Sequence, residues 1–118
     1  MSFFLFSLLA AATATPDYYS ADQFKQDCSD IGRIDGCFAF VSAVSDTSRA
    51  YQQWMNFREY CLPAGVMRGD LRDATLRYLD LHPREGDALA ASVVILALKD
   101  RYPCAADPAP AVPATPAK

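Results

Sequence analysis

Hydrophobic residues recur at helical spacing in four stretches of this chain. The run 20–23, Ser-Ala-Asp-Gln, has the form of a capping box, and Phe24 and Cys28 follow it four residues apart. This pattern predicts a short first helix that ends in the loop around Gly32. A second helix is expected to begin at residue 35 or 36. One face of it consists of Cys37, Phe40, Val41, Val44 and Ser48.

Pro63 and Gly65 interrupt the chain before a third predicted helix. This helix is expected to end at His82, because Pro83 disfavours the helical conformation in the residue before it. One face of the helix consists of Leu71, Ala74, Thr75, Tyr78 and Leu79.

A fourth helix is predicted over residues 88–102, with residues 86–87, Gly-Asp, as its cap. Most of it is apolar all round, with Ser92 as the exception. A helix without a polar face lies either at the centre of a bundle or against a second subunit. The second arrangement would form a homodimer through Val94 and Leu98. Both arrangements are compatible with an all-α fold, a small four-helix bundle.

The chain has four cysteines, Cys28, Cys37, Cys61 and Cys104, which allow three pairings. Cys28 ends the first predicted helix and Cys37 starts the second, so a short loop brings them together. Cys61 and Cys104 flank two helices that run out and back. Other pairings would bridge a helix length of roughly 20 Å, whereas the Cα atoms of a disulfide lie at most about 7 Å apart. We therefore predict the bridges Cys28–Cys37 and Cys61–Cys104, which are typical of an oxidising compartment.

The two ends of the chain differ in composition from its middle. Residues 3–12 are apolar, and Ala-Thr-Ala at 12–14 supplies the small residues that a signal peptidase accepts. Residues 1–14 are predicted to be a removed signal peptide, because this apolar run is too short to span a bilayer. Residues 105–118 are almost entirely alanine and proline, which predicts a disordered, solvated tail, with a polyproline ligand or a spacer as the alternative. One helical domain, residues 15–104, lies between these ends.

Charge and motifs exclude several classes of function. The net charge of −3 is small and both signs are interspersed, so neither nucleic acid nor a membrane surface is an expected partner. An enzyme is not expected either. His82 is the only histidine and precedes a proline, the cysteines are expected to be oxidised, and no C-x₂-C element could bind zinc. No glycine-rich phosphate loop occurs, and no cofactor is predicted.

Residues 51–60 are rich in aromatic residues and also contain Met and Arg, the types enriched at interface hot spots. The residues expected to contact a partner are Tyr51, Trp54, Phe57 and Arg58. The alternative is that Trp54, Phe57 and Tyr60 close the bottom of the bundle. A mixed arrangement would turn one face inward and leave Arg58 and one aromatic side chain outside.

The turn 83–87, Pro-Arg-Glu-Gly-Asp, is a second candidate contact. Its charged residues Arg84 and Glu85 could enter a cleft of a partner. The alternative is ordinary capping, in which Pro83 ends one helix and Gly86 with Asp87 starts the next.

A set of short motifs spans residues 20–104. They are Cys28, Cys37-x-x-Phe40-Val41, Cys61-Leu62-Pro63-x-Gly65-Val66, Tyr78-Leu79, His82-Pro83, Ala97-Leu98 and Tyr102-Pro103-Cys104. Together they resemble the Rap/Tai family, small exported immunity proteins of bacterial type VI secretion systems. The resemblance implies an all-helical, disulfide-bonded periplasmic protein, often dimeric. Such a protein would bind a peptidoglycan-degrading effector, typically a cell-wall amidase, and occlude its active site.

Two positions depart from the family pattern. Family members tend to carry a glycine at the position of Ala43, so the second helix is expected to run further here. They also tend to carry a hydroxyl or similar cap near Met67. Because the Met67 side chain cannot take that role, the third helix is expected to have a weaker cap, at a cost of about 1 kcal/mol.

The expected function is therefore that of a non-catalytic immunity protein with a cognate effector as its partner. The rival hypothesis is a general envelope protein, structural or chaperone-like, that uses its apolar helix for many clients. A chaperone should expose apolar surface and bind unfolded clients, whereas an inhibitor should have one tight stoichiometric partner.

Overall fold

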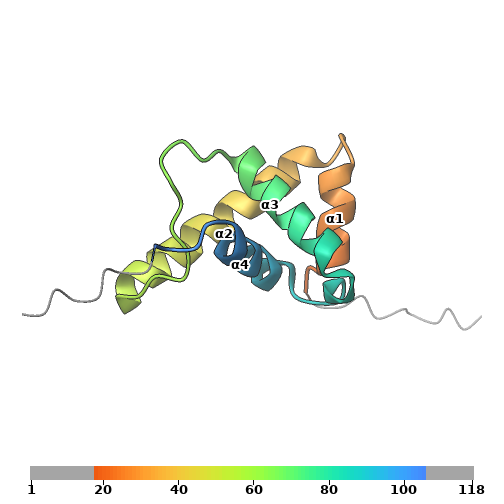
Figure 1. Cartoon of the computed structure of the whole chain (residues 1–118). Helices are drawn as coiled ribbons and strands as arrows, with labels where there is room; N and C mark the ends of the chain where they lie inside the picture. Colours follow the sequence, from red (N-terminus) through yellow and green to blue (C-terminus); the bar gives the residue numbers. More distant parts are fainter. Residues whose placement is uncertain (1–17, 106–118) are drawn as a thin grey trace, which may run out of the picture.

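The helical pattern of the sequence forms four α-helices in the computed structural model, which describes residues 18–105 (Figure 1). The elements are α1 (Ala21–Ser29), α2 (Ile34–Met55), α3 (Arg68–Leu81), the short 3-10 helix η1 (Pro83–Glu85) and α4 (Ala90–Arg101). No β-strand occurs among these residues, and the one β-bridge joins Ser20 to Leu89. The predicted all-α, four-helix fold is confirmed. The predicted signal peptide, residues 1–14, and nearly all of the predicted tail lie outside the described residues.

The capping box at the start of α1 is formed as predicted. The Ser20 hydroxyl accepts a hydrogen bond from the Gln23 N–H at 3.2 Å, and the Gln23 side chain accepts one from the Ser20 N–H at 3.0 Å. These two bonds satisfy backbone donors that have no partner within the helix. The local sequence therefore fixes where the first helix begins.

The start of α4 differs from the prediction. Residues 86–87 do not cap this helix, which begins at Ala90 with Leu89 at the N-cap and no side-chain cap. The Ala90 N–H donates instead to the Tyr19 carbonyl at 2.9 Å, and the Ala21 N–H donates to the Ala88 carbonyl at 2.9 Å. The backbone before α1 thus accepts a hydrogen bond from a backbone N–H at the start of α4 that has no partner within the helix. No local sequence pattern indicates this long-range contact.

Helix α4 occupies the centre of the bundle and packs against the other three helices. Val94 and Leu98 have no exposed surface, and they share the interior with Phe24 and Val41. The alternative in which Val94 and Leu98 face a second subunit is therefore wrong. They are interior because the other three helices pack over this face of α4.

Both predicted disulfides are present, and no free cysteine remains among the described residues. Cys28–Cys37 joins the end of α1 to the first turn of α2, with Cα atoms 5.1 Å apart. Cys61–Cys104 joins the segment after α2 to the segment after α4, with Cα atoms 4.8 Å apart. The first bridge is buried in the core, whereas both cysteines of the second are half-buried.

Helix α3 ends at Leu81 with His82 as its C-cap, in agreement with the effect expected of Pro83. At its start, the Asp70 carboxylate accepts a hydrogen bond from the Met67 N–H at 2.8 Å. Met67 occupies the N-cap position and is 71% exposed. Half of a capping box is therefore present, and the N-cap hydroxyl that would complete it is missing.

Replacing Met67 by Ser is expected to raise the free energy of unfolding by about 1 kcal/mol. A Ser hydroxyl at the N-cap would accept a hydrogen bond from the first turn of α3, while the exposed Met side chain contributes little packing. Urea denaturation followed by circular dichroism measures the change. Met67→Ala is the matched control, and equal stability of the two variants would contradict the missing-cap argument.

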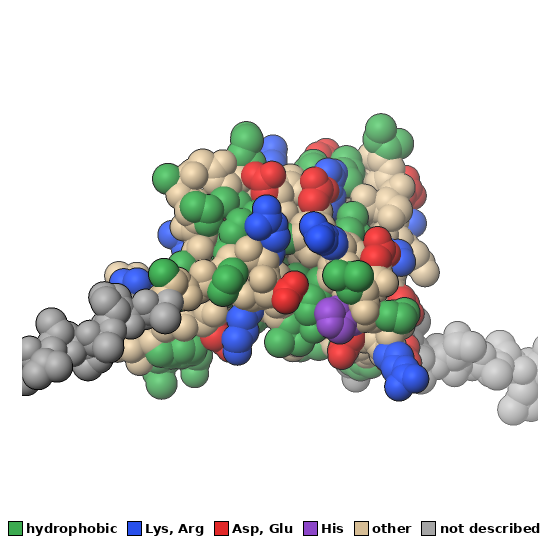
Figure 2. Space-filling model, in the orientation of Figure 1, with side chains coloured by type: hydrophobic (Ala, Val, Ile, Leu, Met, Phe, Trp, Pro, Cys, Tyr) green, Lys and Arg blue, Asp and Glu red, His purple; other side chains and the backbone are tan. Residues whose placement is uncertain are grey.

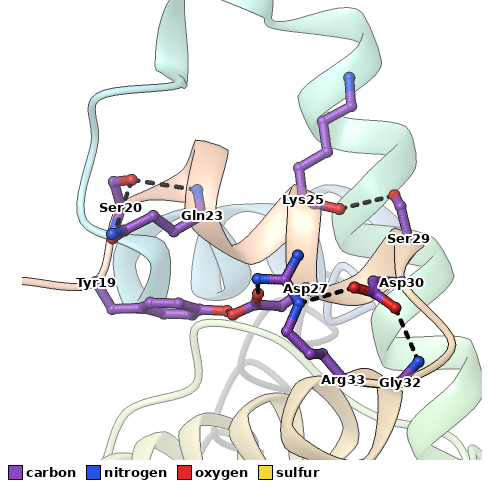
Figure 3. Close-up of polar contacts among 9 residues, drawn as sticks. All are labelled: Tyr19, Ser20, Gln23, Lys25, Asp27, Ser29, Asp30, Gly32 and Arg33. Carbon is purple, nitrogen blue, oxygen red and sulfur yellow. Dashed lines mark hydrogen bonds and ion pairs between the residues drawn. The ribbon is translucent and has the colours of Figure 1, made fainter.

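A hydrogen-bonded network ties the loop between α1 and α2 to the end of α1 (Figure 3). The half-buried Tyr19 hydroxyl donates to Asp27 at 2.6 Å, and the Arg33 guanidinium pairs with the same carboxylate at 2.7 Å. Arg33 also pairs with Asp30 at 3.0 Å, and the Gly32 N–H donates to Asp30 at 2.9 Å. The Gly32 N–H and the Arg33 guanidinium hold the pKa of Asp30 below its ordinary value.

Replacing Tyr19 by Phe is expected to weaken the dependence of the free energy of unfolding on pH in the alkaline range. Burial, together with the hydrogen bond to Asp27, raises the pKa of Tyr19. The folded protein thus holds the phenol proton more tightly than the unfolded chain, so this stabilisation is complete below about pH 10 and declines as pH rises further. The free energy of unfolding of the variant should be about 1 kcal/mol lower at neutral pH. Above about pH 10 it should fall less steeply with pH than that of the unmodified protein.

Urea denaturation at a series of pH values tests this dependence. Tyr78, whose pKa burial also raises, is present in both proteins and cancels in the comparison. Tyr18→Phe serves as the control because it removes an exposed hydroxyl bonded only to the Asp87 carbonyl. Parallel pH curves for Tyr19→Phe and the unmodified protein would contradict the prediction.

Candidate partner-binding surface

The C-terminal end of α2 projects beyond the other helices (Figure 1). Helix α2 has 22 residues, against 14 in α3 and 12 in α4, so it is longer than either by roughly 12 Å or more. Its last turns therefore have no helix to cover them. Among the exposed residues at this end, we call the three aromatic ones together with Met55 and Arg58 the α2 tip: Tyr51, Trp54, Met55, Phe57 and Arg58.

The α2 tip exposes large apolar side chains to solvent. Trp54 is 79% exposed and Phe57 is 41% exposed. The Tyr51 and Phe57 rings pack edge to face with their centroids 6.0 Å apart. Hydrophobic side chains gather at the lower left of the space-filling view, below this end of α2 (Figure 2). An exposed cluster of this kind is more typical of an interaction site than of an ordinary surface.

The end of α2 is terminated by a residue in the left-handed conformation. Asn56 has a φ of 53° and forms the C-cap, and the Phe57 N–H donates to the Gln52 carbonyl at 3.0 Å. Asparagine tolerates this conformation better than most residues. The chain therefore reverses at Asn56 and runs back along α2 toward Cys61.

The returning segment turns Tyr60 into the core. Tyr60 is 4% exposed, and its hydroxyl donates to the Ser45 carbonyl at 3.1 Å and also contacts the Ser48 hydroxyl. The Gln52 side chain accepts a hydrogen bond from the Glu59 N–H at 2.8 Å. Of the three aromatic residues that could have closed the bundle, Tyr60 does so, whereas Trp54 and Phe57 remain largely outside.

An apolar groove of about 500 Å³ lies between α2 and α4, next to the α2 tip. Its lining includes Phe40, Ala43, Val44, Thr47, Tyr51, Ala91 and Ile95. Tyr51 belongs to both the groove and the tip. Sequence reasoning missed this groove, because the residues on α4 that complete it come from a distant part of the chain.

The second predicted contact, Arg84 and Glu85, lies elsewhere. Arg84 is exposed and Glu85 half-buried, and both belong to η1, at the opposite end of the bundle from the α2 tip (Figure 1). The turn that follows is held by the Asp22 N–H, which donates to the Gly86 carbonyl at 2.9 Å. The structure therefore does not bring the two predicted groups of partner-binding residues together. The capping alternative holds for Pro83 but not for residues 86–87.

His82 is exposed and stacks on the Tyr78 ring, with centroids 4.0 Å apart and planes 18° apart. Its Nδ1 lies 2.8 Å from the Tyr78 carbonyl oxygen. Across residues 18–105, no group of three or more His, Cys, Asp or Glu side chains is placed to hold a metal ion. In the same part of the chain, no helix is both long enough and apolar enough to cross a membrane.

These features define a small all-α protein, held by two disulfides, with an exposed aromatic surface at one end. The family model of Rap1a immunity proteins matches residues 20–104. The chain therefore belongs to this family, as the sequence motifs indicated, and an immunity protein counters a secreted effector. Searches of curated proteins and of solved structures found no match. The matched region begins at the Ser20 cap and ends at Cys104 of the second disulfide.

Proposed function

We propose that this protein is exported to the periplasm, where it binds and blocks a peptidoglycan-degrading, amidase-type effector delivered by type VI secretion. Membership of the immunity family supports the role, and the two disulfides support an oxidising compartment. The apolar run at residues 3–12 supports export through a cleaved signal peptide. The protein would act by occlusion and would catalyse nothing itself.

The observation that carries this proposal is the exposed α2 tip. Trp and Tyr anchors bury a large area with few polar atoms, and Arg58 adds a guanidinium that can pair with a carboxylate of the effector. A projecting aromatic tip has the shape needed to enter the substrate cleft of a hydrolase. Arg84 and Glu85 form a second candidate contact, at the other end of the bundle.

A homodimer remains part of the proposal, with a changed interface. Val94 and Leu98 are buried within one chain, so two copies would have to meet through other residues. The apolar groove between α2 and α4 offers one such surface. Sedimentation velocity at several concentrations would show whether two copies associate.

The decisive experiment combines the purified protein, residues 15–118, with the effector encoded beside its gene. We expect one tight complex of fixed stoichiometry, measured by calorimetry, and loss of peptidoglycan cleavage at that same ratio. A reduced, unfolded client protein serves as the control for chaperone-like binding. Binding to the unfolded client together with none to the neighbouring effector or to cell-wall amidases would overturn the immunity role.

A further inference from the structure

We propose that residues 106–111, directly after Ala105, dock onto their own domain beside the C-terminal half of α2, anchored by Asp107 between Arg49 and Arg58. The proposal concerns the free protein and needs no effector. It replaces the expectation of a fully solvated tail for these six residues only.

The site is a hollow of about 1150 Å³ beside the point where the described chain ends. We call it the exit hollow. Its walls include Arg49 and Gln53 on α2, Phe57 and Arg58 in the returning segment, and Ala105. The blue end of the chain passes beside the C-terminal half of α2 (Figure 1). Ala105, the last described residue, therefore lies at the wall of this hollow.

Charge complementarity identifies the anchor. Within residues 18–105, neither Arg49 nor Arg58 forms an ion pair. Asp107 is the only acidic residue in 106–118 and follows Ala105 by two positions. Two extended residues span at most about 7 Å, so Asp107 can reach into the hollow that Arg49 and Arg58 line together with Ala105. A carboxylate and a guanidinium form the strongest type of side-chain hydrogen bond.

The prolines of the segment match the aromatic and amide side chains that line the exit hollow. Pro108 and Pro110 favour the polyproline II conformation, which docks in grooves that combine aromatic rings with polar hydrogen-bond donors. Phe57 provides the exposed ring, and the Gln53 side chain provides an amide donor for a backbone carbonyl.

Because the segment is covalently joined to the domain, weak contacts are sufficient to keep it docked. A segment joined to the wall of its own site has an effective concentration in the millimolar range or above. Docking would cover Phe57 and Arg58, so an effector that uses the α2 tip would have to displace the segment first. Only this last consequence depends on the proposed function.

Nuclear magnetic resonance of the free protein tests the docking. We compare residues 15–118 with a chain that ends at Ala105 and keeps both disulfides. We expect Overhauser contacts between the Pro108 or Pro110 ring protons and the Phe57 ring, and displaced Arg58 side-chain resonances in the truncated protein. Backbone order parameters for residues 107–111 should lie near the value of about 0.85 for rigid backbone, whereas free residues fall below about 0.6. Low order parameters with unchanged Arg58 resonances would overturn the proposal.

Two variants and a dilution series sharpen the test. Asp107→Asn should lower the ratio of docked to free segment about threefold, and raising the salt concentration should act in the same direction. Asp35→Asn, an exposed substitution in the first turn of α2 and far from the exit hollow, is the matched control and should leave the ratio unchanged. If the segment of the Asp107→Asn protein docks as well as that of the control, Asp107 is not the anchor. Contacts that vanish on dilution would assign the segment to a second copy and overturn docking within one chain.

Discussion

Replacing Cys61 and Cys104 together by Ala is expected to lower the free energy of unfolding by about 4 kcal/mol. The bridge closes a chain separation of 43 residues, and its removal restores that conformational freedom to the unfolded state. Both cysteines are only half-buried, so little packing is lost with them. For a domain of this size, the melting temperature should fall by roughly 20 °C. Urea denaturation and thermal scans of the doubly substituted protein measure both quantities.

The matched control is the double substitution of Cys28 and Cys37 by Ala. Their separation of 9 residues predicts an entropic loss of only about 2.6 kcal/mol. However, Cys37 is fully buried and Cys28 is 6% exposed, so lost packing adds to this entropic loss. The difference in stability between the two double variants is therefore smaller than the loop lengths alone predict. A loss below about 1 kcal/mol for the Cys61 and Cys104 variant would contradict the loop-closure argument.

The sequence was sufficient for those parts of the fold that local chemistry decides. The Ser20 capping box and the stop before Pro83 depend on neighbouring residues only, and both were predicted. The disulfide pairing followed from helix lengths, because a bridge cannot span a helix. The predicted start of α4 was wrong, because the first N–H of this helix donates to the carbonyl of Tyr19, about seventy positions earlier in the chain. Such a partner leaves no local signal.

The candidate surface was predicted in composition but not in orientation. Aromatic content indicated residues 51–60, yet it could not tell which ring turns inward. That choice depends on the reversal at Asn56 and on the greater length of α2 compared with its neighbours. The reversal carries Tyr60 into the core, while Trp54 lies on turns that no other helix covers. The separation of Arg84 from the α2 tip likewise follows from the packing of the helices, which spacing along the chain does not reveal.

Trp54→Ala is expected to weaken binding of the effector by roughly 30-fold to 1000-fold, the range of a hot-spot truncation. The indole is 79% exposed in the free protein, so nearly all of its surface is available to be buried by a partner. For the same reason, the free energy of unfolding should change by no more than about 0.5 kcal/mol. Calorimetry with the effector and urea denaturation of the free variant separate these two effects.

Tyr60→Phe should show the opposite pattern and serves as the matched aromatic control. It removes the buried hydroxyl bonded to Ser45 and Ser48, which should cost about 1 to 2 kcal/mol of stability and leave the affinity for the effector unchanged. Leu81→Ala removes an exposed apolar side chain outside the α2 tip and should affect neither quantity strongly. If Trp54→Ala binds as tightly as the unmodified protein while Arg84→Ala binds weakly, the effector contacts η1 instead. In that case the projecting end of α2 is not the inhibitory surface.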